Sequence, residues 1–546
     1  MRKYRSAIVR TICCSALTMM FVTAVYAEKK VQKTKEDIFL DNLMKKMTID
    51  EKIGQLNLLS SWGFLSSPTK NGKSEIMDMV ENGEVGALYG YKNVSSMRHM
   101  QNIALSTKNK IPYFFGLDVI HCLETSYPTP LAMSCSWNPN LVEQYARHAA
   151  LEANSLGVNW VFSPMVDIAH DARWGRVVEG AGEDPYLGGM MARAYVKGYQ
   201  GDGDFSKVGN VMTCIKHYAL YGAVEAGRDY NSVIMDRQTM FNNYMRPYYE
   251  ACKAGAASYM TSFNEVEGIP ATVNSYLINN VLRKQWGFKG FVVTDATAIK
   301  ELTVHGIGNL QTTSARALKA GVDMDMNSLG FLKTLRKSLA EGKVKQADID
   351  QACRRILKVK YDCGLFEDPF RFLNSKRARA NVYNTEMKAQ SKKTADECSV
   401  LLKNDGNLLP ISPEKKIAVI GPFADNPIQM QGSWSMSSHG KESISIYQGI
   451  KEATDKAGGS TTTCTGSWLM CDSTTESALV NGLLGFFVKD YKPKPVHSQP
   501  LQLMIDEAVT QAKAADVVVA CVGESIDMNG EGASRSDITI PDAQKI

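Results

Sequence analysis

The chain has 546 residues, which is too long for one compact core and indicates about two to four domains. Its composition, 44% apolar and 22% charged, is that of a globular protein and excludes extensive disorder. The formal charge of +5 falls to +1 without residues 1–27, which carry four basic and no acidic side chains. A near-neutral chain without Lys/Arg clusters gives no support for nucleic-acid binding.

Residues 1–27 have the pattern of a secretory signal peptide. A basic start is followed by an uncharged apolar run over 11–27, which ends in A-V-Y-A before Glu28. The alternative is a membrane anchor, but the run is shorter than the roughly 20 residues that a spanning helix needs. We predict cleavage after Ala27, a periplasmic or secreted protein, and no membrane association after cleavage.

Between residues 85 and 326, short β-branched or aromatic runs alternate with helical stretches. Predicted strands are 85–90, 113–118, 158–163, 211–215, 258–263, 290–294 and 322–326, with 55–59 as a doubtful eighth. One helix spans 139–156, where Asn138 caps and Pro139 takes the first turn, and another follows Asp236. Repeated β–α units imply parallel strands joined by crossover helices. The strand number favours a (β/α)8 TIM-like barrel over a doubly wound sheet.

The pattern changes after residue 326. A helical segment (332–361) leads to a basic, exposed connector (376–379), and a second α/β unit begins near 404–410. Its predicted strands are 416–421, 516–523 and, more weakly, 461–464. The predicted domains are a signal peptide (1–27), a catalytic barrel (28–385), a linker helix (386–403) and an incomplete parallel α/β sandwich (404–546).

The cysteines give no sign of a metal site. Ten lie beyond the signal segment, without a C-x-x-C pair or a Cys/His spacing typical of zinc. Cys464 and Cys471 are close enough in sequence to form a disulfide in an exported protein, but buried apolar residues are the better interpretation for most of the ten. We expect no metal and no cofactor.

Ionisable residues follow four of the predicted strands, where the functional loops of a parallel barrel lie. They are Asp118; Asp167, Arg173, Arg176, Glu179, Glu183 and Asp184; Lys216 and His217; and Asp295. Each has a structural alternative. Asp295 could cap the helix that begins at A-I-K-E-L. Lys216 and His217 could be a strand-end ion pair and a hydrogen-bonded histidine, and Arg173 and Arg176 could anchor the acidic loop after them. The convergence of four strands on one rim favours a functional site.

The motifs narrow the chemistry. No G-x-S-x-G, G-x-x-x-x-G-K-[ST] or G-x-G-x-x-G follows a strand, so the signatures of acyl transfer and nucleotide chemistry are missing. The loop C-V-G-E-S-I-D-M-N-G-E-G-A-S-R-S-D (521–537) imitates the start of a calcium loop, but its twelfth position is Ile538 instead of a bidentate acid. Two carboxylates on separate elements, among charged groups that bind hydroxyls, suit glycoside hydrolysis.

Several segments together resemble family 3 glycoside hydrolases of the periplasmic β-glucosidase type. They are G-L-D-V-I-H, A-R-W-G-R-V-V-E-G-A-G-E-D-P-Y-L-G, I-K-H-Y, W-G-F-K-G-F-V-V-T-D, L-L-K-N-D-G-N-L-L-P and G-E-G-A-S-R, in the family's order over 28–546. The resemblance implies a barrel followed by an α/β sandwich, with the active site in the crevice between them. It implies that Asp295 is the nucleophile and Glu531 the acid/base. The implied sugar-binding residues are Asp118, Arg176, Lys216, His217 and Met260, with Trp434 lining the next subsite.

The implied activity is that of a retaining, exo-acting β-glucosidase that releases terminal β-D-glucose from glucosides or small oligosaccharides by double displacement. We expect Lys216 and Arg176 to keep Asp295 ionised. The residues leave the oligomeric state open.

The sequence suggests three other interpretations. A β-xylosidase or mixed exo-glycosidase of the same family is hard to separate from a β-glucosidase. A β-N-acetylglucosaminidase is disfavoured, because the segment that begins at Lys216 reads K-H-Y-A-L-Y-G and lacks the second histidine of K-H-F-P-G-H-G. A catalytically silent sugar-binding protein or truncated fragment is the third, since the family's second domain normally continues past the last residue of this sequence.

Overall fold

The computed structural model describes residues 33–61, 75–121, 123–480, 497 and 499–546. The predicted signal peptide lies outside these residues. The chain divides into two compact units, residues 1–45 and 46–546. Helix α2 (Lys35–Lys46) begins in the first unit and has two acidic residues in its first turn, where their charges interact favourably with the positive end of the helix dipole. Within the described ranges, no helix is long and apolar enough to cross a bilayer.

The first part of the second unit is an eight-stranded parallel barrel. Its strands are β1 (Asn57–Ser60), β2 (Ala87–Tyr89), β3 (Phe115–Leu117), β4 (Trp160–Val161), β5 (Met212–Tyr218), β6 (Ser258–Thr261), β9 (Phe291–Val293) and β10 (Asp325–Met326). Each of them pairs with the next along the chain from β1 to β9, and β10 pairs with β1. A parallel bridge between Val293 and Met324 links β9 to the residues that enter β10. The predicted barrel is confirmed, and its doubtful first strand is β1.

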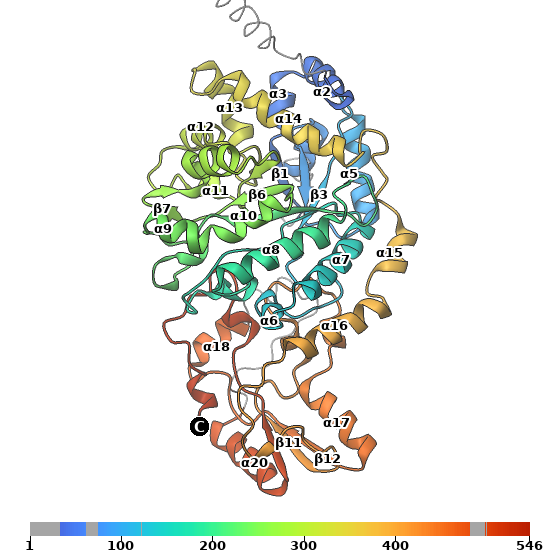
Figure 1. The fold of residues 1–546 in the computed structure, drawn as a ribbon, viewed down its shortest axis with the longest axis vertical. Coiled ribbons are helices and arrows are strands. Elements are labelled where there is room, and N and C mark those ends of the chain that lie inside the picture. Colours follow the sequence, from blue (N-terminus) through green and yellow to red (C-terminus); the bar gives the residue numbers. More distant parts are fainter. Residues whose placement is uncertain (1–32, 62–74, 122, 481–496, 498) are drawn as a thin grey trace, which may run out of the picture. The chain divides into compact units, whose positions relative to one another are not determined.

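Helices connect the strands and surround the sheet (Figure 1). They are α3 (Ile49–Gly54), α4 (Glu75–Glu81), α5 (Val94–Ser106), α6 (Pro130–Cys135), α7 (Pro139–Ser155), α8 (Pro185–Gln200), α9 (Arg237–Thr239), α10 (Arg246–Lys253), α11 (Ala298–Glu301), α12 (Leu310–Ala320), α13 (Gly330–Ala340) and α14 (Gln346–Asp362). Helix α7 begins as predicted, with Asn138 accepting a hydrogen bond from the Leu141 amide and Pro139 in the first turn. The helix predicted after Asp236 is interrupted, because a π-helical turn (Met240–Tyr244) separates α9 from α10.

Aromatic side chains fill the barrel interior. Trp160 is fully buried, and its ring centroid lies 5.4 Å from that of Phe114, 4.7 Å from that of Phe162 and 5.1 Å from that of Phe291. A Cβ at Gly116 in β3 would lie 2.7 Å from the Phe162 ring, so β3 needs glycine at this position. The barrel interior is therefore a packed core, and functional residues are expected at its rim.

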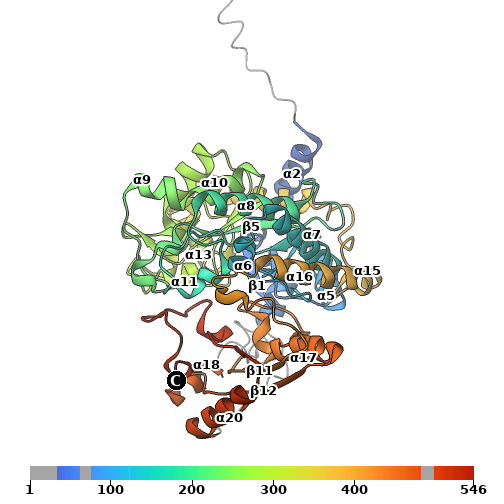
Figure 2. The ribbon, with the colours of Figure 1, turned by 60° about the horizontal axis from the view of Figure 1, so that its bottom comes forward.

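We call residues 399–546, which follow the barrel and contain a smaller parallel sheet, the second domain. Helices α15 (Ser375–Asn381) and α16 (Thr385–Cys398) lead to β11 (Lys416–Ile420), β12 (Ser460–Cys464) and β13 (Val517–Ala520), in the order β12-β11-β13. Helices α17 (Ile446–Ala457) and α20 (Leu501–Ala514) lie beside this sheet (Figure 2), and α18 spans Ser473–Val480. All three predicted strands are present. Cys464 and Cys471 are both free thiols, so the alternative of a disulfide between them is wrong for this structure.

Candidate active site

The ends of the parallel strands carry most of the predicted site residues to one rim. Asp118 follows β3, and Asp295 lies two residues after β9. The sequence placed Lys216 and His217 just after a strand, but they lie within β5, which continues to Tyr218. Met260 is buried in β6, where its Cα pairs with that of Val293. Because the C-terminal ends of parallel strands face the same side, these residues share one face of the barrel.

Lys216 forms a strand-end ion pair, as the structural alternative held, and its partner, which the sequence did not indicate, is Asp118. Lys216 Nζ lies 2.9 Å from Asp118 Oδ1, with the side chains only 3% and 10% exposed. Burial disfavours the ammonium, but the negative charges of Asp118 and Glu179 outweigh it and hold the pKa of Lys216 above its usual value. The pair therefore presents one cation and one anion side by side to any ligand at the rim.

His217 is held as a neutral imidazole with a defined tautomer. Its Nε2 lies 2.9 Å from Arg176 Nη2, and its Nδ1 lies 2.9 Å from Asp167 Oδ2. Because a guanidinium can only donate, Nε2 accepts and Nδ1–H donates to Asp167. Burial, together with the positive charges of Arg176 and Lys216, lowers the pKa of His217 well below its usual value.

Asp167 anchors this imidazole from below the rim. Its carboxylate also accepts hydrogen bonds from the Tyr248 hydroxyl and from the backbone N–H of His217. Burial raises the pKa of Asp167 to about 7 against the opposing effect of these donors. The histidine is thus a hydrogen-bonded residue, as the structural alternative held. Its Nε2 nevertheless lies at the rim, near Asp295.

Arg176 connects the barrel residues to Glu531 of the second domain. It donates to both carboxylate oxygens of Glu179, at 2.8 and 3.1 Å, so it does anchor the acidic loop after it. Its Nη1 lies 3.5 Å from Glu531 Oε1 and makes no hydrogen bond with the described residues. Burial opposes its charge, but the carboxylates of Glu179 and Glu531 prevail and raise its pKa well above the usual value. Arg173 instead pairs with Asp171 and is half-buried.

Asp295 is mostly enclosed. Its side chain is 14% exposed, with Oδ2 lying 3.7 Å from His217 Nε2 and Oδ1 accepting a hydrogen bond from the Ala296 amide. The capping alternative is wrong, because α11 begins at Ala298 after Thr297 and has no side-chain cap.

The electrostatics of Asp295 correct a second expectation. Burial, followed by the negative charge of Glu531, raises the pKa of Asp295, and the cations Arg176 and Lys216 only partly offset this. The two cations therefore do not keep Asp295 ionised by themselves. The charge of Glu531 therefore influences whether Asp295 carries a proton.

Glu531 approaches the rim on a loop that leaves β13. The Tyr230 hydroxyl donates to Glu531 Oε1 at 2.7 Å, and the Glu531 side chain is 26% exposed. Other acids of the same loop have different partners: Glu524 pairs with Arg535, and Asp537 accepts a hydrogen bond from the Thr539 amide. Glu531 is thus the acid of this loop that contacts Arg176 and Tyr230.

Trp434 enters the site from another loop of the second domain. Its Nε1–H donates to Glu179 Oε1 at 3.0 Å, and Lys216 Nζ lies 5.5 Å from the centre of its rings. Its φ of 59° is in the left-handed region, which costs a non-glycine residue about 1–2 kcal/mol. This strain is sustained where the side chain meets the charged rim, a placement common at functional sites.

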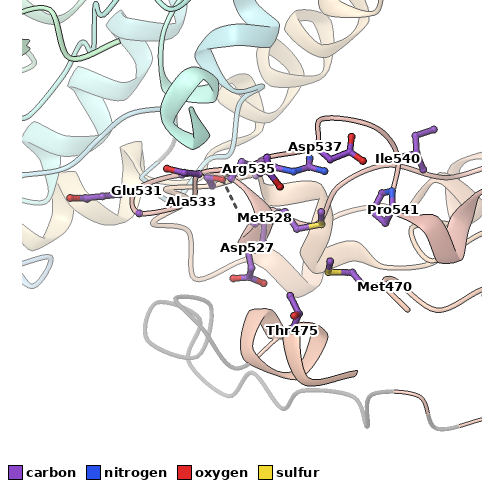
Figure 3. A pocket seen from close by; sticks show the side chains of 18 of the residues that line it. Met470, Thr475, Asp527, Met528, Glu531, Ala533, Arg535, Asp537, Ile540 and Pro541 are labelled. Carbon is purple, nitrogen blue, oxygen red and sulfur yellow. Dashed lines mark hydrogen bonds between the residues drawn. The ribbon is translucent and has the colours of Figure 1, made fainter. Parts of the chain in front are cut away.

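A cavity of about 820 Å³ lies beside the loop that carries Glu531. It is lined by residues of the second domain, including Met470, Thr475 and Met528, and Asp295 does not line it. Figure 3 shows Glu531 extending away from Met470 and Thr475. Glu531 is thus one of the residues that line this cavity, whereas Asp295 lies outside its lining. In the parts of the chain that the structure describes, no group of three or more His, Cys, Asp or Glu side chains is arranged to hold a metal ion.

Some residues that shape the site were missed or undervalued from the sequence. Asp229 and Tyr230 lie in a segment after β5 and contact the Glu531 loop. The sequence places Asp167 and Glu179 at the rim without indicating a function for them. In the structure, Asp167 binds His217 and Glu179 binds Arg176. The available signal was position: all four follow barrel strands, where functional loops lie.

Two family models match the chain. Residues 48–359 match the glycosyl hydrolase family 3 N terminal domain, and residues 399–546 match the glycosyl hydrolase family 3 C-terminal domain. The chain belongs to glycosyl hydrolase family 3. The family resemblance inferred from the motifs is therefore confirmed.

Relatives within the family are named for different activities. The chain is 41% identical to a periplasmic beta-glucosidase of Salmonella typhimurium over 93% of its own length and 65% of the relative's. It is 31% identical to a beta-xylosidase of Formosa agariphila over 77% of its length and 56% of the relative's. A beta-glucosidase of Listeria innocua solved in complex with glucose has a TM-score of 0.82 and 31% identity, covering 94% of this chain and 67% of that one. The chain thus spans less than two thirds of the length of these two curated relatives.

Proposed function

We propose that this family 3 chain is a retaining, exo-acting β-glucosidase that removes terminal β-D-glucose from glucosides or small oligosaccharides. The observation that carries the proposal is the placement of Asp295 and Glu531, two carboxylates from different domains, on either side of one guanidinium–imidazole pair. Arg176 contacts Glu531, and His217, which accepts a hydrogen bond from Arg176, lies beside Asp295. The Asp118 carboxylate can accept, and the Lys216 ammonium can donate, hydrogen bonds to sugar hydroxyls.

In the first step, the Asp295 carboxylate attacks the anomeric carbon as the bond to the aglycone oxygen breaks. Glu531 donates its proton to that oxygen, and a covalent glycosyl-enzyme forms. The step needs one proton on the carboxyl pair, and the proton must be on Glu531. Enclosure raises the pKa of Asp295 before a substrate binds. A bound sugar whose hydroxyls donate to Asp295 would favour its ionised form.

In the second step, Glu531 removes a proton from water while the water oxygen attacks the anomeric carbon. The ester bond to Asp295 breaks and the carboxylate is restored. Arg176 is placed to stabilise Glu531 when it is anionic, and its Nη1, which lacks a hydrogen-bond partner among the described residues, can donate to a sugar hydroxyl. In this mechanism Asp295 forms the covalent bond, Glu531 transfers the protons, and Arg176 stabilises the Glu531 carboxylate.

The surroundings support exo action on a small substrate. Lys216, Asp118 and His217 supply donors and acceptors at the strand ends, where a terminal sugar would be enclosed. Trp434, with Met260 deeper in the rim, would supply apolar contact, and the indole would line the subsite for the leaving group. In this proposal catalysis is assigned to protein side chains alone.

A panel of three aryl glycosides tests the proposal. The chain is assayed on aryl β-glucoside, β-xyloside and β-N-acetylglucosaminide, with the product stereochemistry followed by NMR. The expected result is highest kcat/KM on the glucoside with a β-configured first product. An α-configured first product would exclude the retaining mechanism, and absence of turnover on all three would favour a sugar-binding protein.

A second candidate is a β-xylosidase or mixed exo-glycosidase. The 31% identity to the Formosa agariphila beta-xylosidase favours it. Glucose and xylose differ by one hydroxymethyl group, which is worth only about 10–200-fold in discrimination by a pocket. The ratio of kcat/KM for the glucoside and the xyloside decides between the two.

We also propose export to the periplasm. The signal-like pattern of residues 1–27 and the similarity to a periplasmic beta-glucosidase of Salmonella typhimurium support this. Fractionation of a tagged chain, with N-terminal sequencing of the mature protein, tests it. A mature protein that begins at Glu28 is the expected result, whereas a cytoplasmic, uncleaved chain would contradict it.

A further inference from the structure

We infer that Asp229 is a positioning residue that holds the tip of the Glu531 loop against the barrel and thereby sets the location of the acid/base carboxyl. The inference rests on the proposed function of Glu531 and adds a residue to it. Asp229 lies in the segment after β5, next to Tyr230, and belongs to the barrel part of the chain. The loop that it contacts, residues 529–535, follows β13 of the second domain.

Three hydrogen bonds converge on Asp229. Its Oδ2 accepts from the Gly532 amide at 2.8 Å, and its Oδ1 accepts from Trp174 Nε1–H at 2.9 Å. Its own backbone N–H donates to Ser534 Oγ at 2.8 Å. Trp174 is fully buried, so the indole fixes one carboxylate oxygen and leaves the other aimed at the loop. The carboxylate thus bridges a rigid part of the barrel and the residue that follows Glu531.

The two ends of the loop are held by main-chain contacts. Gly530 N–H donates to Gly175 O at 2.7 Å, and Arg535 N–H donates to Arg173 O at 3.0 Å. Trp174 and Ser534 form an isolated antiparallel bridge. These contacts leave the tip, Glu531 and Gly532, to be fixed by other groups.

The neighbouring side chains Asp229 and Tyr230 provide that fixation. Tyr230 donates to the Glu531 carboxylate itself, whereas Asp229 binds the next amide in the chain. Gly532 has a φ of 74°, a conformation that glycine adopts without strain but that the free loop would not have to keep. Loss of the Asp229 carboxylate would therefore release the backbone at the position where a small shift moves Glu531.

A displaced acid/base has a distinct kinetic signature. A misplacement of about 1 Å can cost on the order of 10²-fold in rate. The cost is largest when the leaving group needs a proton, and it is small for 2,4-dinitrophenolate, which leaves without one. General-base loss also slows hydrolysis of the glycosyl-enzyme, which azide can attack directly because it needs no deprotonation. A purely structural defect would lower kcat/KM on all substrates by the same factor.

The test compares D229A with wild type, using the full chain. We expect kcat/KM on phenyl β-glucoside to fall about 10–100-fold and that on 2,4-dinitrophenyl β-glucoside to fall less than about threefold. With the dinitrophenyl substrate, kcat and KM should fall together, and azide should raise kcat. Equal loss on both substrates, or no loss, would overturn the inference.

Two further variants serve as controls. D236N removes a nearby exposed carboxylate that caps α9 through the Thr239 amide, and it should leave both substrates unchanged. S534A removes the acceptor of the Asp229 amide and should show the same dependence on the leaving group as D229A, with a smaller loss of kcat/KM. This variant keeps the inference testable if D229A fails to fold. E531A gives the full size of the pattern for comparison.

Amide hydrogen exchange separates the inference from the proposed function. In D229A, peptides that cover residues 529–535 should exchange at least about tenfold faster than in wild type or D236N, whether or not the chain hydrolyses glucosides. Unchanged exchange would refute the positioning role by itself. Faster exchange without the leaving-group pattern, in a chain where E531A does show that pattern, would also refute it. If E531A lacks the pattern, the acid/base assignment fails instead.

Discussion

Replacing Asp295 by asparagine should abolish turnover and at the same time stabilise the fold. The change removes the negative charge and keeps an oxygen that can accept the Ala296 amide. If Asp295 is the nucleophile, kcat/KM on an aryl β-glucoside should fall by about 10⁴-fold or more, as for other residues that form a covalent bond to substrate.

The stabilisation follows from the burial of the charge. Because the pKa of Asp295 in the fold is raised, the ionised form is disfavoured there, and stability is lost as the pH rises from the unfolded pKa through the folded one. Each unit of pKa difference corresponds to about 1.4 kcal/mol. D295N carries no charge to bury, so its advantage over wild type should be near zero at pH 4 and grow toward alkaline pH.

Asp118 provides a matched control in the same rim. It is paired with buried Lys216, so D118N leaves an ammonium without its partner and should cost about 3 kcal/mol. Thermal unfolding followed by circular dichroism between pH 4 and 9 compares the two variants. A D295N that is less stable than wild type, or whose difference in Tm does not change with pH, would refute the charge-burial argument. Retained turnover by D295N would show that Asp295 is not the nucleophile.

Three other variants or conditions test the rest of the site. E531A should retain first-step activity only on substrates with good leaving groups and should respond to azide. E524A should keep its activity whatever the leaving group and should not respond to azide, because Glu524 pairs with Arg535; the reverse result would exchange their roles. G175A places a Cβ 1.8 Å from Ala533 O and should push the Glu531 loop away, lowering kcat/KM on phenyl β-glucoside about tenfold or more with little change in Tm; unchanged kinetics would mean that the loop adapts. The pH dependence of inactivation by an activated 2-fluoroglucoside, which needs ionised Asp295, should shift to lower pH in E531Q, since the Glu531 charge is one cause of the raised pKa of Asp295. A shift to higher pH would contradict the coupling of the two carboxyls.

Local patterns in the sequence were sufficient for the framework. Alternating strands and helices predicted the barrel, and the Asn138–Pro139 start of α7 followed from capping chemistry. Strand ends were enough to place Asp118 and Asp295 on one rim, because parallel strands share a direction. These features depend on residues close together in the chain, and periodicity and turn chemistry record them directly.

Tertiary structure decided the chemistry of the individual groups. The sequence expected Arg176 and Lys216 to keep Asp295 ionised, but enclosure and the approach of Glu531 reverse the direction of its pKa shift. The tautomer of His217 follows from Arg176 on one side and Asp167 on the other. The contacts of Asp229 and Tyr230 with the Glu531 loop join segments about three hundred residues apart. Burial and Coulomb interactions act through space between such segments, and no local pattern encodes them.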